Sequence, residues 1–356
     1  MRISNSRRPA WALVSALMFA ACSNPTPLAP TAPALIGTPV SVRTPVPAAP
    51  TAAGVTPSSA TPPPAKPLTS PIPTPTVPVV SVRGKLAFSS DESGVFQIYV
   101  TSFPGGVVKA ITASPNPGDA EARWSPDGAF FVFNSGRVAV EGYGIYRMNA
   151  DGSGQTRLIA LPAKRSLNFS PQISPDGTKL IFHTNRDGNF EIYSANVDGS
   201  GLKNLTNDPG NDVNPAWSRA GDLITWSANR IGDGYQLYVA KSDGSNPRQI
   251  LSQPSSNTAR PAFSPDGKRI AFTIQSFVST PAKIALIGVE GSGFRVLDLG
   301  PGEFLMGDWI DDDTLVYSWR QGDSEKYKIV TSRLDGTNRQ VLVSVAGDAL
   351  YPAWTK

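Results

Sequence analysis

Carboxylate and amide side chains recur in this sequence three to six positions before a large residue, which is successively Trp124, Ile173, Trp217, Phe263, Trp309 and Trp354. Oxygen-bearing side chains of this kind can bind calcium when several converge, or they can bind a cationic group of a partner. Asp and Asn are also favoured in turns, so a purely structural role is the alternative. The candidate binding residues are Asp119, Glu121, Asn168, Asp212, Asn214, Asn257, Arg260, Glu303 and Asp348, and the candidate calcium ligands are Asp119, Asp212 and Asp348.

Residues for nucleophilic or zinc chemistry are scarce. No Gly-x-Ser-x-Gly motif occurs. The single histidine, His183, follows Phe182 on an apolar strand, where we expect a role in the core or on the strand surface rather than in a triad. One histidine and one cysteine cannot form the usual His/Cys zinc site. We therefore assign no catalytic residue and no required cofactor, keep calcium as the one candidate ion, and favour a non-enzymatic role.

The elements that position these residues repeat along the chain. The large residues recur every 44 to 49 positions. In each unit a short strand ends at the large residue, a Ser-Pro-Asp-Gly turn follows, and an apolar strand such as 179–183 comes next. A third strand, an Asp-Gly-Ser turn and a fourth strand complete an antiparallel meander. A period in the forties that is made of short strands is typical of propeller blades.

Residues 84–356 provide room for six such units. The first unit begins at Lys85 with a second-strand sequence, and the last unit ends at Trp354 with a first-strand sequence. Joining the two ends completes one blade and leaves no long exposed sheet edge. The predicted fold is therefore all-β, a six-bladed β-propeller of four-stranded antiparallel blades that is closed by N- and C-terminal strands in one blade.

The pattern resembles the TolB-like six-bladed β-propeller family, with WD40-like repeats, over residues 84–356. The matching elements are the Trp-Ser-Pro-Asp-Gly phrase, an Ile-Ala-Phe strand, an Ile-Tyr strand and an Asp-Gly-Ser turn. The resemblance implies the fold but leaves the function open, because such blades serve envelope proteins, protease accessory domains and hydrolases. TolB proteins also carry an N-terminal globular domain, and a proline-rich segment occupies that place here.

The N-terminal segment 1–21 has the pattern of a lipoprotein signal peptide. Three arginines precede an apolar run at 11–21 that is too short to span a bilayer. Removing this segment lowers the net charge from +4 to +1, so most of the excess positive charge lies in the predicted export signal. We therefore exclude nucleic acid as a partner. Cys22, the only cysteine, follows Ala20 and Ala21 in a sequence that resembles a lipobox. This resemblance implies diacylglycerol on Cys22, and ordinary cleavage beside an incidental cysteine is the alternative.

Residues 22–83 form a segment rich in Pro, Thr and Ala, with few large apolar side chains. Such a composition does not offset the entropy lost on ordering, and its prolines favour extended conformations. We interpret this segment as a disordered tether that begins at lipidated Cys22. Because no second cysteine is present, no disulfide can form within the chain, and stability must come from core burial.

The two ends of the predicted propeller differ. The tight turns lie on one face, while the first-strand starts and the longer loops lie on the other. Variable loops of this kind are where binding residues of a propeller are expected. For Asp187 and Arg230, local bracing of a loop is at least as well founded as ligand contact. The repeated Trp and Tyr residues are interpreted as packing between blades. The longer loops are 136–144 with Arg137 and Glu141, 185–188, 229–234, 276–283 and 320–326.

Together these features predict a lipoprotein anchored by diacylglycerol to a bacterial envelope membrane, on the periplasmic or another extracytoplasmic face. Its propeller would act as a binding or scaffold module for an envelope protein or peptide. The alternative is a cation-dependent hydrolase or lyase, or a small-ligand binder, that uses the acidic and amide mouth of the central channel.

Overall fold

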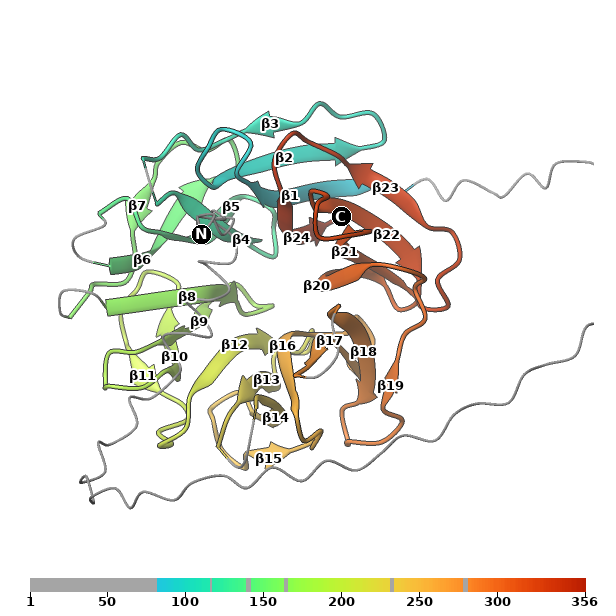
Figure 1. Cartoon of the computed structure of the whole chain (residues 1–356). Coiled ribbons are helices and arrows are strands. Elements are labelled where there is room, and N and C mark those ends of the chain that lie inside the picture. The colour runs from blue at the N-terminus through green and yellow to red at the C-terminus, as the bar shows by residue number, and fades with distance from the viewer. Residues whose placement is uncertain (1–81, 116, 139–141, 163–165, 231–233, 278–280) are drawn as a thin grey trace, which may run out of the picture. The chain divides into compact units, whose positions relative to one another are not determined.

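The computed structural model describes residues 82–356, apart from 116, 139–141, 163–165, 231–233 and 278–280. The predicted signal peptide, Cys22, nearly all of the tether and loop residue Glu141 lie outside the described residues. The described chain folds into strands that surround a common centre (Figure 1). This part of the chain contains no helix with the length and hydrophobicity of a membrane span.

The strands form antiparallel meanders of four. Four sheets contain one meander each, and the eight-stranded sheet contains two meanders that are joined by a short parallel pairing of β6 with β8. The prediction of an all-β propeller with four-stranded antiparallel blades is confirmed. The strands of the eight-stranded sheet are β4 (Asp119–Trp124), β5 (Phe130–Ser135), β6 (Gly142–Asn149), β7 (Thr156–Arg157), β8 (Ser166–Ile173), β9 (Lys179–Thr184), β10 (Glu191–Asn196) and β11 (Lys203–Asn204).

Three of the remaining sheets are continuous in sequence. They comprise β12 (Asp212–Trp217), β13 (Leu223–Ala228), β14 (Gln236–Lys241) and β15 (Arg248–Gln249); β16 (Ser256–Phe263), β17 (Arg269–Ser276), β18 (Lys283–Gly288) and β19 (Arg295–Val296); and β20 (Glu303–Asp311), β21 (Thr314–Arg320), β22 (Lys328–Arg333) and β23 (Gln340–Val343). In every meander the first strand lies nearest the centre and the fourth lies at the rim (Figure 1).

The last sheet joins the two ends of the described chain. Its strands are β24 (Ala349–Thr355), β1 (Gly84–Ser90), β2 (Gln97–Phe103) and β3 (Lys109–Ala110), in that order. β24 pairs antiparallel with β1, so that Trp354 lies opposite Leu86. Contacts between first strands run from β4 through β8, β12, β16, β20 and β24 and back to β4. The terminal strands therefore close the ring, as the sequence predicts.

The Ser-Pro-Asp-Gly turn is fixed by its own side chains. In the first copy, Ser125 Oγ donates to Asp127 Oδ1 at 2.5 Å, and the same carboxylate accepts the Ala129 N–H at 3.0 Å. Gly128 adopts φ 68°, in the left-handed region that glycine enters without steric cost. The bond from Ser125 is the main cause of the lowered pKa of Asp127. This local chemistry explains why the motif could be recognised without knowledge of the fold.

The apolar core lies between successive sheets. One cluster joins Ala271 and Leu286 from β17 and β18 to Phe304 and Trp309 from β20. Trp309 is buried, and its indole N–H donates to the Ala262 carbonyl of the preceding sheet at 3.0 Å. Burying a side chain of this size contributes roughly 2 to 3 kcal/mol. This cluster has the inter-blade packing that the sequence assigned to the repeated aromatic residues.

Candidate functional site

The carboxylates and amides near the starts of the first strands are paired with cations from loops. Each cation lies at the end of the second strand of a meander or in the loop between the second and third strands. The N···O distances in these pairs run from 2.5 to 3.4 Å. The pairs are Asp119 with Arg137, Asn168 with Arg186, Asp212 with Arg230, Glu303 with Arg320, and Asp348 with Lys326.

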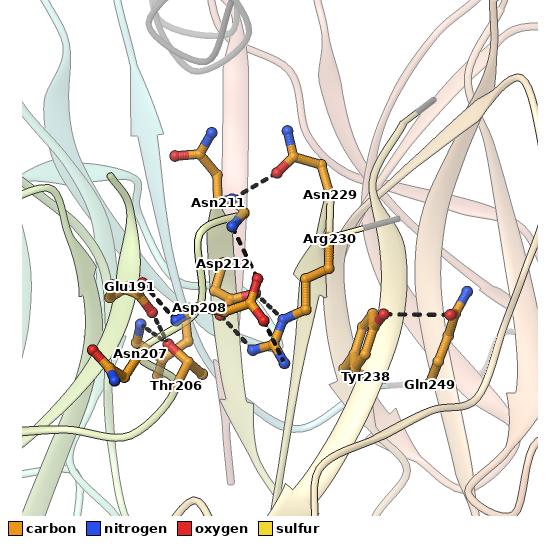
Figure 2. A network of polar contacts seen from close by, with 12 residues as sticks. Glu191, Thr206, Asn207, Asp208, Asn211, Asp212, Asn229, Arg230, Tyr238 and Gln249 are labelled. Carbon is orange, nitrogen blue, oxygen red and sulfur yellow. Dashed lines mark hydrogen bonds and ion pairs between the residues drawn. The ribbon is translucent and has the colours of Figure 1, made fainter. Parts of the chain in front are cut away.

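The Asp212 pair shows how these contacts brace a loop (Figure 2). Asp212 is fully buried and accepts two bonds from Arg230, at 3.0 and 2.5 Å, and one from the Trp226 indole at 3.1 Å. The Arg230 guanidinium also lies 4.9 Å from the centre of the Tyr238 ring. Burial alone would lower the pKa of Arg230, but its bonds to Asp212 raise it. The structure therefore assigns Arg230 to loop bracing rather than to ligand contact.

The three predicted calcium ligands are not brought together. Asp119, Asp212 and Asp348 each face a separate cation. In the ranges that the structure describes, no group of three or more His, Cys, Asp or Glu side chains is placed to hold a metal ion. Asn257 is also engaged, because its Oδ1 accepts the Tyr235 backbone N–H at 2.9 Å. These residues at the starts of the first strands therefore form ion pairs and hydrogen bonds with neighbouring loops.

A different set of residues faces the central channel. Each lies three positions before the large residue of its repeat and adopts a left-handed backbone conformation, with φ between 51 and 59°. Each also lies at a shift in the pairing register between the first and second strands, which marks a β-bulge. A residue other than glycine in this conformation costs about 1 to 2 kcal/mol. The set, called the bulge ring below, is Glu121, Ser170, Asn214, Arg260 and Tyr351.

The bulge-ring side chains contact one another. Glu121 Oε2 accepts the Ser170 N–H at 2.9 Å and its hydroxyl at 3.2 Å, and Asn214 Nδ2 donates to Ser170 Oγ at 3.1 Å. Arg260 Nη2 lies 3.6 Å from Glu121 Oε1, and the Arg260 guanidinium lies 3.8 Å from the centre of the Tyr351 ring. These residues belong to the first strands of five meanders, so their side chains meet at the centre of the ring.

Two hollows adjoin the bulge ring. A narrow cavity of about 20 Å³ is lined by Glu121, Ser170, Asn214 and Arg260, together with Arg123 and Gln172. A wider cavity of about 270 Å³ shares Arg123, Gln172 and Gly307 and extends to the Ser-Pro-Asp-Gly turns. The sequence predicts only a structural role for the Ser-Pro-Asp-Gly turns. The structure adds a cavity on that side of the ring.

His183 lies next to the bulge-ring residue Asn214. It is fully buried, with Phe169 and Phe190 rings on either side. Burial lowers its pKa to about 3, so the imidazole is neutral near pH 7. Its Nδ1 faces the Asn214 N–H at 3.4 Å. The structure therefore gives His183 the core role that the sequence predicts.

The sequence interpretation found part of the bulge ring. Glu121, Asn214 and Arg260 are among the residues that the sequence predicts for binding, whereas Ser170 and Tyr351 are not. The signal that separates the two groups is position. Candidates three residues before the large residue lie at the channel, and those five or six residues before it are used in loop structure.

Comparison with known proteins gives matches over much of the described chain. The family model of the TolB beta propeller domain matches residues 160–356. An uncharacterised protein of Agrobacterium fabrum is 30% identical over 206 residues, which cover 54% of this chain and 67% of that protein. A TolB homolog of Chlorobium luteolum is 29% identical over 181 residues, which cover 51% of this chain but only 37% of that protein.

A solved structure, TolB from Acinetobacter baumannii, has the same fold. Its TM-score is 0.61 at 21% identity, and the match covers 76% of this chain and 66% of that chain. At this identity the likeness concerns the fold alone.

Proposed function

This chain belongs to the TolB β-propeller family, and from that premise we propose that it is an exported envelope protein whose propeller binds a protein or peptide at its central channel. We further infer that the six meanders are the six blades of a single ring. The eight-stranded sheet counts as two blades, because its halves are joined only by the short pairing of β6 with β8.

The observation that carries this proposal is the bulge ring. Five residues other than glycine hold left-handed conformations at one equivalent position, although each conformation costs stability. Such conformations cluster at binding and catalytic sites, where the surrounding structure holds them. Here they place one carboxylate, one guanidinium, one amide and one hydroxyl around the narrow cavity, and the Tyr351 ring lies against the guanidinium of Arg260. This is a polar surface suited to a protein or peptide ligand.

The anchor and the tether complete the proposed role. Cys22 would carry diacylglycerol in an envelope membrane, and residues 22–83 would let the propeller reach a partner at some distance from that membrane. The basis is the lipobox-like sequence at Cys22 and the proline-rich composition after it. Cys22, nearly all of residues 22–83 and the predicted signal peptide 1–21 lie outside the described residues.

We favour binding over the alternative of a cation-dependent hydrolase or lyase. The side chain that most often acts as acid or base near pH 7 is histidine, and the only histidine in the chain is buried and neutral. The carboxylates that would hold a cation at the strand starts face separate arginine and lysine side chains. The channel groups are better suited to forming hydrogen bonds with a ligand.

Photo-crosslinking in cells tests the proposal. A photoreactive amino acid at Gln172, which lines both cavities and is partly exposed, should capture a discrete envelope protein. The matched control is a probe at Val296 on rim strand β19, which is 49% exposed. Capture from Gln172 but not from Val296 is the expected result. Equal capture at both positions, or none at Gln172 in a folded and expressed protein, would contradict channel binding.

A further inference from the structure

Arg260 differs from the three loop arginines that pair with carboxylates near the starts of the first strands. Arg137, Arg230 and Arg320 each donate hydrogen bonds to a carboxylate at 2.5 to 3.1 Å. The carboxylate oxygen that faces Arg260, Glu121 Oε1, is 3.6 Å away, which is longer than a hydrogen bond. The loop arginines are thus held by carboxylates, whereas in the described part of the chain no carboxylate lies within hydrogen-bond distance of the Arg260 guanidinium, whose five N–H donors exceed what its contact with Tyr351 can use.

The position of Arg260 is nevertheless well defined. Its backbone is held at φ 54° in a bulge, its guanidinium stacks against Tyr351, and only 14% of its side chain is exposed. Glu121 Oε1 lies near enough to attract the cation but beyond hydrogen-bond distance of it, and Glu121 Oε2 is held by two bonds from Ser170. A donor that is oriented before the ligand arrives loses little freedom on binding.

The surroundings of Arg260 favour an anion of small size. The narrow cavity is lined by two arginines, Arg123 and Arg260, and one carboxylate, Glu121, while the Asp308 carboxylate acts on Arg123 from the adjoining wider cavity. Its volume of about 20 Å³ is enough for about one water-sized group. A single carboxylate oxygen fits this space. The wider cavity of about 270 Å³ has room for the residue that carries the carboxylate.

We propose that Arg260 binds a carboxylate of the channel ligand, with the Asn214 amide beside it. The carboxylate belongs either to an Asp or Glu side chain or to a free C-terminus, both of which present the same two oxygens to the guanidinium fork. This inference rests on the proposed binding function and specifies the chemistry that the channel selects.

Calorimetric titration of the full chain tests the inference with four probes. They are the capped peptide acetyl-Gly-Gly-Asp-Gly-Gly-amide, its Asn counterpart, acetyl-Gly-Gly-Gly with a free C-terminus, and inorganic phosphate. At least one carboxylate peptide should bind about tenfold or more tightly than the Asn peptide, because charge-assisted hydrogen bonds in a buried site are strong. The peptide that shows this preference identifies the source of the carboxylate.

Three variants locate the effect. Arg260→Gln should lose the preference, and Arg260→Lys should keep part of it, because lysine supplies the charge without the planar fork. Arg295→Gln, on exposed rim strand β19, removes the same charge and should behave as wild type. Melting temperatures of all three variants check that each is folded, and the Lys variant remains informative if the Gln variant is unstable.

The inference is overturned if the wild type shows no preference for a carboxylate, if Arg260→Gln retains the preference, or if phosphate binds equally well through Arg260. These results are distinct from failure of the proposed function. Capture of a protein from Gln172 without a carboxylate preference leaves channel binding intact. A carboxylate preference without capture leaves a site for small organic acids and removes the protein-binding role.

Discussion

The guanidinium of Arg260 lies 3.8 Å from the centre of the Tyr351 ring, although the two residues belong to the first strands of different sheets. Both residues have left-handed backbones, at φ 54 and 59°. A strained backbone at one repeated position thus builds the polar centre of this propeller.

Ser170 provides a direct measure of the strain. Both Ser170→Gly and Ser170→Ala remove the hydroxyl, but only glycine adopts φ 51° without steric cost. We expect the Gly variant to have a free energy of unfolding about 1 kcal/mol higher than the Ala variant, as measured by urea denaturation. At Ser227, in regular strand β13, the order should reverse because glycine weakens an ordinary strand. The same order at both positions would contradict strain at the bulge.

Removal of Arg230 should destabilise the propeller severely. Arg230→Gln leaves the Asp212 carboxylate buried without its cation, and the expected loss is about 3 to 5 kcal/mol in the free energy of unfolding. Arg248 pairs with Glu290 at a similar distance, 3.0 Å, but both side chains are well exposed, so Arg248→Gln should cost less than about 1 kcal/mol. Similar losses in the two variants would show that Asp212 and Arg230 do not form a buried structural pair.

The buried imidazole of His183 should make stability depend on pH. Its pKa falls from 6.5 in the unfolded chain to about 3 in the folded one because of burial, so the unfolded state binds more protons between these values. The stabilisation that neutral His183 allows is therefore fully present above pH 6.5 and is lost as the pH falls. Between roughly pH 7.5 and pH 5 the expected loss is about 2 kcal/mol.

His183→Asn isolates this contribution, because its side-chain oxygen can accept from the Asn214 N–H but does not titrate. Urea denaturation at both pH values should show a smaller decrease for the variant than for the wild type. An identical decrease in the two proteins would mean that His183 is accessible to protons in the folded state.

Calcium should have little influence on the folded chain. The three candidate ligands face separate cations, so neither calcium nor a chelator should shift the melting temperature through binding to the native state. Differential scanning calorimetry with and without each reagent gives the comparison. A calcium-dependent rise that disappears in Asp212→Asn would contradict this expectation and support the calcium site that the sequence suggests.

The four-stranded meander could be predicted from the sequence because neighbouring residues determine its turns. The residues of Ser125 to Gly128 satisfy one another within a single turn, so their meaning does not depend on distant parts of the chain. The closing strand was also predictable, since β24 and β1 are each the missing half of one repeat. The prediction of a TolB-like propeller is confirmed.

The sequence did not predict which polar residues brace loops and which belong to the bulge ring. Asp119 and Glu121 are two positions apart and would share one face of a regular strand. The bulge at Glu121 separates them, so Asp119 meets Arg137 while Glu121 meets Ser170 and Arg260. A bulge depends on the register with a neighbouring strand, and periodicity in the sequence does not reveal it.

The central claim is that a partner binds at the bulge ring. The measurement that tests it most directly is hydrogen–deuterium exchange of the full chain, alone and with the protein captured from the Gln172 probe. We predict that the partner slows exchange in the first strands around Ser170 and Asn214 and leaves rim strands β19 and β23 unchanged. Slower exchange at the rim with no change around the bulge ring would contradict the account.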